Sequence, residues 1–259
     1  MNAFHLFAGA GGGILASLLL GHKIIGANEI DGYCCDVLRQ RQIDGCLPEF
    51  PIWNMDIREF NERIAPTYAG MVDILCGGFP CQPFSVAGKG RGKGDRRNMW
   101  PATLNAVRII RPTFCFFENV PGLRRHPYYT QILFDLCIEG YFTHDGILSA
   151  GDCGATHKRE RLWIMAYSHS DGLFSIQSQN VGTKRKQNEA QVGGDYWKFF
   201  TLGQAGSPLC TREWDAPPEP TRVVDGIPYQ LERLKCLGNG QVPIVAAVAE
   251  TILMRSFEG

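Results

Sequence analysis

The stretch Ala-Phe-His-Leu-Phe-Ala-Gly-Ala-Gly-Gly-Gly, residues 3–13, does most to decide the fold. Its first half is a short apolar segment with the character of a β-strand, and glycines occupy positions 9, 11, 12 and 13. A helical run, residues 14–20, follows and is stopped by Gly21. A strand, a glycine turn and a helix in this order are typical of an open α/β sheet, in which glycines let the backbone approach a bound cofactor closely.

Two acidic residues downstream of this turn indicate what the cofactor contains. A second predicted strand, residues 23–28, ends at Glu29, about 20 residues after the glycine turn, where an acid usually holds ribose hydroxyls. Asp56 follows a third short strand-like segment and is a candidate for binding an adenine amino group. The glycine spacing is not the Gly-x-Gly-x-x-Gly of dinucleotide enzymes. The pattern therefore favours an adenosine-containing cofactor over NAD or FAD.

Strand and helix signals continue to alternate through the first 165 residues. Asp31 is predicted to cap a helix that carries Tyr33, Val37 and Leu38 on one face. Further strands are predicted at residues 72–76, 113–117 and 161–166, with helices at 99–110 and 128–138 between them. This alternation predicts one open α/β sheet. A chain of 259 residues has room for one such domain and a small appendage.

Composition narrows the function classes. Hydrophobic residues make up 44% of the chain and charged residues 20%, as in ordinary globular proteins, and the zero net charge neither favours nor excludes a nucleic-acid partner. No apolar run approaches 18 residues, so we expect no membrane span. The ten cysteines and six histidines lack metal-type spacing, so we expect no metal. Without a leader sequence, the cysteines suggest reduced thiols in the cytoplasm.

One cysteine stands apart from the other nine. Cys81 lies between two prolines after a predicted strand, so its backbone is held extended at the edge of the sheet where ligands bind. A glycine-rich loop follows, with five basic residues and one acid between Lys89 and Arg97. These features favour Cys81 as a reactive nucleophile. For the other nine cysteines we expect buried, unreactive side chains.

In these features the chain resembles the DNA cytosine-5 methyltransferases over nearly its whole length. Segments similar to the family's motifs occur in the family's order: Phe7-Ala8-Gly9-Ala10-Gly11-Gly12, Asn28-Glu29, Asp56-Ile57, Pro80-Cys81-Gln82, Glu118-Asn119-Val120, Arg159-Glu160-Arg161 and Gly238-Asn239. Two departures are His157 in place of the usual Gln before the arginine pair, and Gly240-Gln241 where the family more often has Ser-Val.

The resemblance implies a Rossmann-like, S-adenosylmethionine (SAM)-dependent methyltransferase acting on double-stranded DNA. It implies catalytic roles for Cys81, which attacks C6 of cytosine, for Glu118 at N3, and for Arg159 and Arg161, the latter at O2. The cofactor residues it implies are Phe7, Gly9, Gly11, Gly12, Glu29, Ile30, Asp56, Ile57 and Asn239. The DNA contacts it implies are Ser85, Lys89, Arg91 and Arg97, around a base flipped out of the duplex.

The region between the arginine pair and Gly238 is expected to be a separate unit. Residues 168–235 lose periodicity and suggest a small, irregular target-recognition region, short for the family and without a recognisable ninth motif. We expect residues 1–167 to form the catalytic domain, completed by residues 236–259, whose helix at 244–253 returns to the sheet through Val245, Val248 and Ile252.

Three functional interpretations remain open from the sequence. The first is DNA methylation for restriction–modification or phage self-protection, by a monomer in the cytoplasm of a bacterial or phage-infected cell, with a cognate restriction endonuclease as the expected partner. The second is a tRNA cytosine-5 methyltransferase with the same chemistry. The third is a SAM-binding partner subunit without activity, against which the intact Cys81, Glu118 and Arg161 argue.

Overall fold

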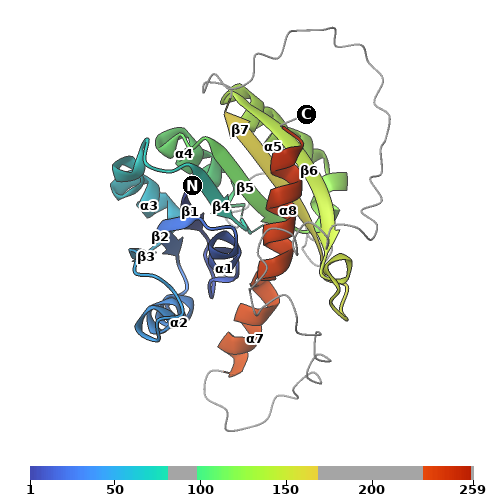
Figure 1. Ribbon diagram of the computed structural model, residues 1–259. Helices are drawn as coiled ribbons and strands as arrows, with labels where there is room; N and C mark the ends of the chain where they lie inside the picture. The colour runs from blue at the N-terminus through green and yellow to red at the C-terminus, as the bar shows by residue number, and fades with distance from the viewer. Residues whose placement is uncertain (81–97, 169–229, 258–259) are drawn as a thin grey trace, which may run out of the picture.

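The computed structural model describes residues 1–80, 98–168 and 230–257. Seven strands form one sheet in the order β3-β2-β1-β4-β5-β7-β6 (Figure 1). The first five strands in this order run parallel, and β7 is antiparallel to both of its neighbours. The strands are β1 Asn2–Leu6, β2 Lys23–Glu29, β3 Ile52–Asn54, β4 Ile74–Gly77, β5 Phe114–Asn119, β6 Tyr141–Ser149 and β7 Glu160–Ser168. The predicted α/β sheet is confirmed.

Helices cover both faces of this sheet. They are α1 Gly12–Leu19, α2 Gly32–Ile43, α3 Ile57–Arg63, α4 Trp100–Ile110, α5 Pro127–Ile138, α7 Gln230–Asn239 and α8 Pro243–Arg255. Buried side chains of α3, α4 and α5 belong to one hydrophobic core, and those of α1, α2 and α8 belong to the other. The fold is therefore doubly wound, with the sheet as its middle layer.

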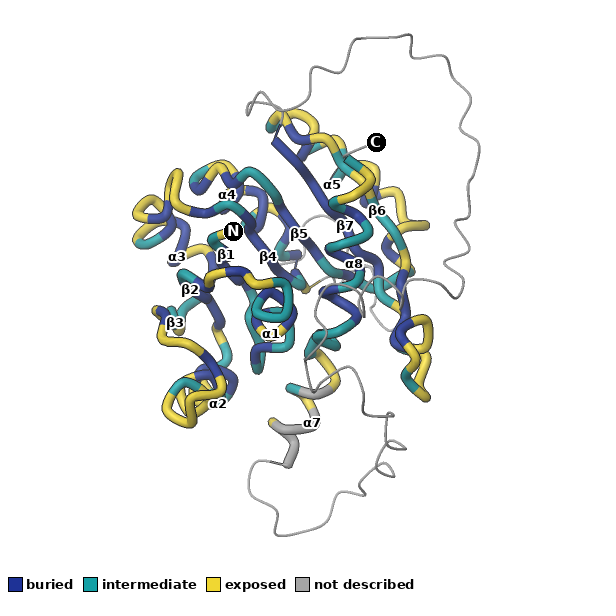
Figure 2. Tube along the Cα trace, in the orientation of Figure 1, coloured by how far each residue is buried: buried dark blue, intermediate teal, exposed yellow. Residues whose placement is uncertain are grey.

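The sheet divides the two cores because successive side chains of a strand point to opposite faces. On β1, Phe4 and Leu6 pack in the core with α4, while Ala3 packs in the core with α1 and α8. All three are fully or almost fully buried, and the central strands are buried along most of their length (Figure 2). Strands covered on both faces explain the near-continuous apolar runs in the sequence.

Capping residues fix where the helices begin. The Asp31 carboxylate accepts hydrogen bonds from the backbone N–H groups of Tyr33 (3.1 Å) and Cys34 (3.4 Å), which confirms the predicted cap of α2. Proline stands in the first turn of α4, α5 and α8, where its missing N–H costs no hydrogen bond. The start of α2 therefore lies directly after Glu29, at the carboxyl end of β2.

The C-terminal helix returns to the sheet as predicted. α8 packs against α1 and against β6 and β7, with Val245, Ala249 and Leu253 buried. Val248 and Ile252, expected on the inner face, are only partly buried because α8 turns its Ala246 and Glu250 side inward as well. In Figure 1, α7 lies beyond the sheet and leads directly into α8.

The structure departs from the sequence analysis at three places. Residues 230–235, expected to be irregular, form the first part of α7, because Leu-Glu-Arg-Leu-Lys is a run of strong helix formers. The edge strand β6 was not anticipated. Cys46 and Cys137 are exposed rather than buried.

Among the described residues, no helix has the length and apolarity needed to cross a membrane, and no group of three acidic, histidine or cysteine side chains is arranged to hold a metal ion.

Candidate active site

A cavity of about 540 Å³ opens at the carboxyl ends of the parallel strands. β1 pairs with β2 on one side and with β4 on the other, so the strand order reverses at this point, where open α/β sheets bind their ligands. The volume falls within the range of small-molecule sites. Its walls are formed by Phe7, Gly9, Glu29, Ile30, Asp31, Cys34, Gly78, Phe79, Pro80, Glu118, Asn119, Val120, Arg161, Lys235, Cys236, Gly238, Asn239 and Gly240.

The glycine turn forms one wall of this cavity with a left-handed backbone. φ is 51° at Phe7, 52° at Gly9 and 95° at Gly11. Such a value is strained at a non-glycine residue, and strain of this kind gathers where a turn must approach a ligand. A Cβ placed on Gly9 would meet no atom within 4 Å, so the space beside this residue is open. Gly9 thus leaves open space in the wall of the cavity.

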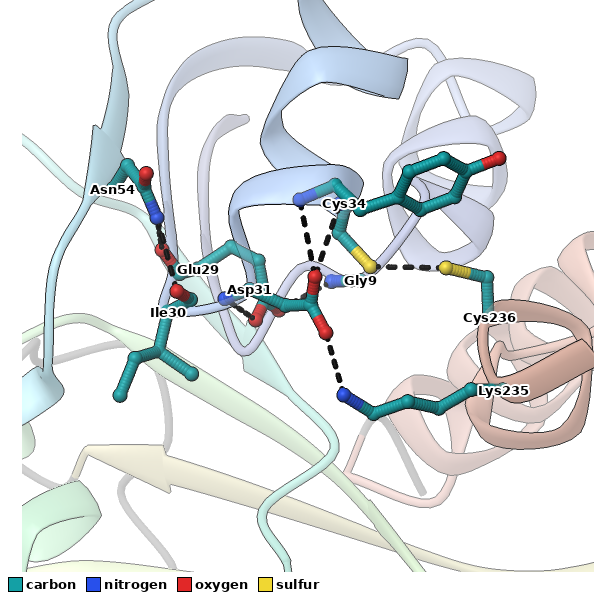
Figure 3. Close-up of polar contacts among 9 residues, drawn as sticks. Gly9, Glu29, Ile30, Asp31, Cys34, Asn54, Lys235 and Cys236 are labelled. Atoms are coloured by element: carbon teal, nitrogen blue, oxygen red, sulfur yellow. Dashed lines mark hydrogen bonds and ion pairs between the residues drawn. The ribbon is translucent and has the colours of Figure 1, made fainter. Parts of the chain in front are cut away.

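Glu29 is the carboxylate at the end of the cavity beside the glycine turn. Its two oxygens accept backbone hydrogen bonds, Oε2 from Gly9 (2.7 Å) and Oε1 from Asp31 (2.8 Å), as Figure 3 shows. The side-chain amide of Asn54 holds the same turn by donating to the carbonyls of Glu29 (3.1 Å) and Ile30 (3.0 Å). Each carboxylate oxygen keeps a lone pair for a further donor. This arrangement suits the two hydroxyls of a ribose.

The α7 helix contributes the opposite side of the cavity mouth. Lys235 Nζ lies 2.6 Å from Asp31 Oδ2, and Cys236 Sγ lies 3.1 Å from Cys34 Sγ (Figure 3). The hydrogen bond with Lys235 lowers the pKa of the Asp31 carboxyl. These two contacts join α7 to the first turn of α2, directly beside Glu29.

Glu118 is the carboxylate at the other end of the cavity, where β5 ends. Its Oε1 lies 2.7 Å from Arg161 Nε on β7, and the side-chain amide of Gln241 donates a hydrogen bond to the same carboxylate. Burial raises the pKa of Glu118, and the arginines and hydrogen bonds oppose that rise. A buried carboxyl group with an elevated pKa is suited to exchanging a proton with a bound ligand.

The backbone leading to Cys81 is held next to Glu118. The side-chain amide of Asn119 donates to the carbonyl of Phe79 (3.0 Å), and its oxygen accepts from the backbone N–H of Val120 (2.9 Å). The ring of Phe79 is buried between Trp100 and Phe117, with centroid separations of 5.3 and 6.1 Å. Residues 79 and 80 therefore leave β4 in a fixed position at the Glu118 end of the cavity.

Several predicted cofactor residues lie outside the cavity walls. Asp56 caps α3 by accepting from the backbone N–H of Arg58 (2.8 Å) and pairs with the Arg58 side chain, and Ile57 is buried in the core. A Cβ on Gly12 would lie 2.2 Å from the carbonyl oxygen of Gln241, so Gly12 makes room for the protein's own backbone. Gly11 begins α1 and packs against Leu38.

Arg159 also has a different position from the one expected. Its Nη2 donates to the carbonyls of Gly238 (2.9 Å) and Gly240 (2.5 Å), so it holds the turn between α7 and α8. Burial, and then the neighbouring charge of Arg161, lower the pKa of this guanidinium. Arg159 thus supports the wall containing Asn239, while Arg161 faces the cavity. The predicted functional residues Cys81, Ser85, Lys89, Arg91 and Arg97 lie outside the described residues.

Some wall residues were missed by sequence reasoning. Gly78 and Phe79 stand just before the proline–cysteine segment, and that proximity is a usable signal. Asp31 was recognised as a cap, although its place two residues after Glu29 also puts it at the cavity. Lys235 and Cys236 had no signal because the helix that carries them was not predicted.

The fold and the cavity together define an open α/β protein whose cavity has a carboxylate at one end and a carboxylate–arginine pair at the other. Residues 1–202 match the family described as C-5 cytosine-specific DNA methylase. Because the match covers more than half of the chain, the chain belongs to this family.

Curated relatives agree with this assignment. M.HgiCII from Herpetosiphon aurantiacus, named a Type II methyltransferase, is 33% identical over 188 residues, which cover 70% of this chain and 40% of that protein. M.HhaI from Haemophilus parahaemolyticus, also named a Type II methyltransferase, is 33% identical over 176 residues, covering 66% of this chain and 50% of that protein. The chain therefore matches half or less of the length of these relatives.

Solved structures share the fold. A Spodoptera frugiperda DNMT2 variant superposes with a TM-score of 0.53 at 20% identity, covering 71% of this chain and 55% of that one. Dnmt2 from S. pombe gives a TM-score of 0.52 at 22% identity, covering 71% and 57%. At this identity the likeness concerns the fold, and it supports the Rossmann-like architecture.

Proposed function

We propose that this chain transfers a methyl group from SAM to C5 of a cytosine in double-stranded DNA. Family membership supports the reaction class. The observation that carries the proposal is one cavity with two specialised ends, Glu29 beside the glycine turn and the Glu118–Arg161 pair beside the segment leading to Cys81. A cofactor at the first end would meet a base at the second.

The cofactor end is proposed to bind SAM. Glu29 would accept the ribose hydroxyls, and Gly9 leaves the space that the cofactor needs beside the turn. Phe7, Ile30 and Asn239, all in the cavity wall, would complete its surroundings. When bound, SAM supplies an electrophilic methyl group.

The base end is proposed to make C5 of cytosine nucleophilic. The Cys81 thiolate would attack C6, forming a sulfur–carbon bond and moving negative charge toward N3 and O2 of the ring. Glu118 would stabilise that charge at N3 and Arg161 at O2, each contributing roughly 2.7–4 kcal/mol. After methyl transfer, loss of the C5 proton and departure of the Cys81 sulfur would restore the aromatic ring.

The target base is proposed to be flipped out of the duplex, because C5 and C6 must reach groups inside the cavity. Ser85, Lys89, Arg91 and Arg97 would contact the DNA around it, and the basic residues would bind phosphates. Residues 168–235 would read the sequence, while residues 1–167 and 236–259 perform the chemistry.

The biological role is proposed to be restriction–modification. The relatives named Type II methyltransferases support this role over the tRNA alternative, since the Dnmt2 structures are similar only at the level of the fold. We propose a monomer that acts on DNA in the bacterial cytoplasm, with a cognate restriction endonuclease as its counterpart in the cell.

A methyl-transfer assay tests the reaction and its substrate together. The full chain is incubated with SAM labelled in the methyl group and with duplex DNA, tRNA or no nucleic acid. We expect label in DNA as 5-methylcytosine, and none with Cys81→Ser. Label in tRNA would establish the second interpretation, and SAM binding without transfer to either nucleic acid would support the inactive-subunit interpretation.

A further inference from the structure

Gln241 packs where Gly12, Gly13 and Gly78 have no side chains. A Cβ on Gly12 would lie 2.2 Å from the Gln241 carbonyl oxygen, and one on Gly13 would lie 2.5 Å from its Oε1. A Cβ on Gly78 would lie 3.4 Å from Gln241 Nε2. The side chain therefore reaches from the start of α1 to the end of β4. Residue 241 is where the sequence departs from the Ser-Val expected for the family.

The far end of this side chain meets Glu118. The Gln241 amide donates a hydrogen bond to the Glu118 carboxylate, and Arg161 binds Oε1 of that carboxylate from β7. The Cβ position of Gly78, close to Gln241 Nε2, is 2.6 Å from Glu118 Oε2. Glu118 is thus held by two donors from different parts of the fold, one charged and one neutral.

We propose that Gln241 is a positioning residue that orients the Glu118 carboxyl toward the target base and links it to the cofactor turn. The inference rests on the proposed function, because it assumes that Glu118 contacts the base. Gln241 suits this task since its neutral amide fixes one oxygen without adding a second positive charge. A second cation would hold the carboxyl ionised more strongly and hinder its protonation.

The link to the cofactor turn follows from the packing. The Gln241 backbone contacts the Gly12 position, and its Oε1 lies against Gly13, in the first turn of the helix that follows the cofactor turn. A cofactor that shifts this turn would shift the amide that holds Glu118. Gln241 therefore contacts both the helix that follows the glycine turn and the Glu118 carboxyl.

Two substitutions test the role of Gln241. Gln241→Leu removes the donor, and Gln241→Met removes it with an uncharged side chain of similar length, in case the leucine variant fails to fold. We expect kcat to fall roughly ten- to hundredfold and SAM affinity to change little. The lost hydrogen bond is made to the Glu118 carboxyl, and hydrogen bonds to groups that ionise are stronger than those between neutral groups. Gln40→Leu is the matched control, because Gln40 makes the same kind of hydrogen bond with Asp44 (2.8 Å) on the exposed side of α2.

A titration separates this proposal from the proposed function. The donor lowers the pKa of Glu118, so its loss should move that pKa upward. ¹³C-carboxyl NMR, with Glu118→Gln to assign the signal, reads this shift even if the chain methylates nothing. An unmoved Glu118 titration together with wild-type kcat would overturn the positioning role. A moved titration in a chain that labels no DNA would instead refute the proposed function alone.

A second inference concerns Cys34 and Cys236. Their sulfurs are 3.1 Å apart although they come from α2 and α7, and both side chains line the mouth of the cavity (Figure 3). The adjacent Lys235–Asp31 contact (2.6 Å) joins the same two helices. Two free thiols in contact need only a small movement to reach bonding distance.

We propose that these two cysteines form a reversible disulfide that ties α7 to α2 and restricts access to the cofactor end of the cavity. The oxidant is a peroxide. Cys236, which is half-buried, is oxidised first to a sulfenic acid with release of one water. The Cys34 thiol then attacks that sulfur, forms the disulfide and releases a second water. Burial raises the pKa of Cys34, so this thiol is poorly suited to react with the peroxide first.

The disulfide is tested by comparing oxidised and reduced protein. After hydrogen peroxide treatment, peptide mapping should find Cys34 joined to Cys236, and dithiothreitol should reverse the bond. Association and dissociation of SAM should both slow several-fold when the wild-type protein is oxidised, whereas peroxide treatment should not change the SAM kinetics of Cys34→Ser. Cys46→Ser, which removes an exposed thiol beyond the end of α2, should behave like wild type. A disulfide to another cysteine, no disulfide, or unchanged SAM kinetics would overturn the inference.

Discussion

Two glutamates face the same cavity and are held in different ways. Glu29 receives its hydrogen bonds from the backbone N–H groups of Gly9 and Asp31. Glu118 receives its hydrogen bonds from the side chains of Arg161 and Gln241. Both stand at the carboxyl end of a parallel strand, so the sheet explains where they are, and their partners explain how they differ.

This difference indicates that Glu29 and Glu118 have different roles. Backbone donors are fixed by the turn, so the Glu29 carboxylate has a fixed direction, as binding of a constant cofactor group requires. Side-chain donors can rearrange, and burial raises the pKa of Glu118, so this carboxyl can change its protonation during a reaction. We therefore expect Glu29 to control cofactor affinity and Glu118 to control turnover.

The largest effect is expected for Glu118→Gln. The amide keeps the shape of the carboxyl but cannot exchange a proton, so kcat should fall by about 10²–10³ while the dissociation constant of SAM stays near wild type. Steady-state kinetics and calorimetry measure the two quantities separately. A variant with weakened SAM binding and unchanged turnover would reverse the roles assigned to the two glutamates.

Glu29→Ala should show the complementary pattern. Removing the carboxylate removes charge-assisted hydrogen bonds to the ribose, which should weaken SAM binding by roughly 1.5–3 kcal/mol, about ten- to hundredfold in the dissociation constant. At saturating SAM, turnover should recover. Isothermal calorimetry gives the affinity, and unchanged affinity would remove Glu29 from the cofactor site.

A third buried glutamate, away from the cavity, sharpens the comparison. Glu250 on α8 is 1% exposed and lies 3.4 Å from His22, and burial raises its pKa from 4.5 to about 8. Burial also lowers the pKa of His22 to about 4, so His22 stays neutral over this range. Between pH 4.5 and 8 the folded protein therefore keeps a proton at Glu250 that the unfolded chain releases.

At Glu250 the folded state binds more protons than the unfolded chain, so the contribution of this residue to stability should fall as pH rises through this window, by up to about 1.4 kcal/mol per pH unit. Glu250→Gln should remove that dependence and stabilise the protein more at about pH 7.5 than at about pH 5. Urea unfolding at the two pH values measures it. An equal effect at both would show that Glu250 is not protonated in the fold.

The smallest effect is expected for Lys235→Met. The contact with Asp31 is short, but the lysine side chain is 62% exposed, and exposed ion pairs contribute about 0–1 kcal/mol. Thermal unfolding should change little, and any loss should shrink further in high salt. A large, salt-independent loss would mean that α7 depends on this pair for its position.

The order of strands and helices was predictable because each signal was local. The glycines after residue 7, the acid at Glu29 and the cap at Asp31 need only a few neighbours to be understood. The edge strand β6 was missed because it is only partly buried and carries no clear alternation. α7 was missed because it follows a long irregular stretch that obscured its helix-forming residues.

The parts of the candidate site that a local motif identifies could be predicted from the sequence. The parts that depend on a contact between distant segments could not. Glu29, Glu118 and Arg161 line the cavity as expected. The position of Arg159 against the Gly238–Gly240 turn depends on two segments about 80 residues apart, which no local pattern reveals. The same holds for Gln241, whose space is provided by glycines at the ends of other elements.

The most direct test of the central claim is a covalent trap at Cys81. In DNA carrying 5-fluorocytosine at the target position, fluorine replaces the proton that must leave C5, so elimination cannot follow methyl transfer. We predict a stable protein–DNA adduct that requires SAM, maps to Cys81 and is absent in Cys81→Ser, whose hydroxyl lacks a thiolate's nucleophilicity near neutral pH. An adduct at another cysteine, or a fully active Cys81→Ser protein, would contradict the account.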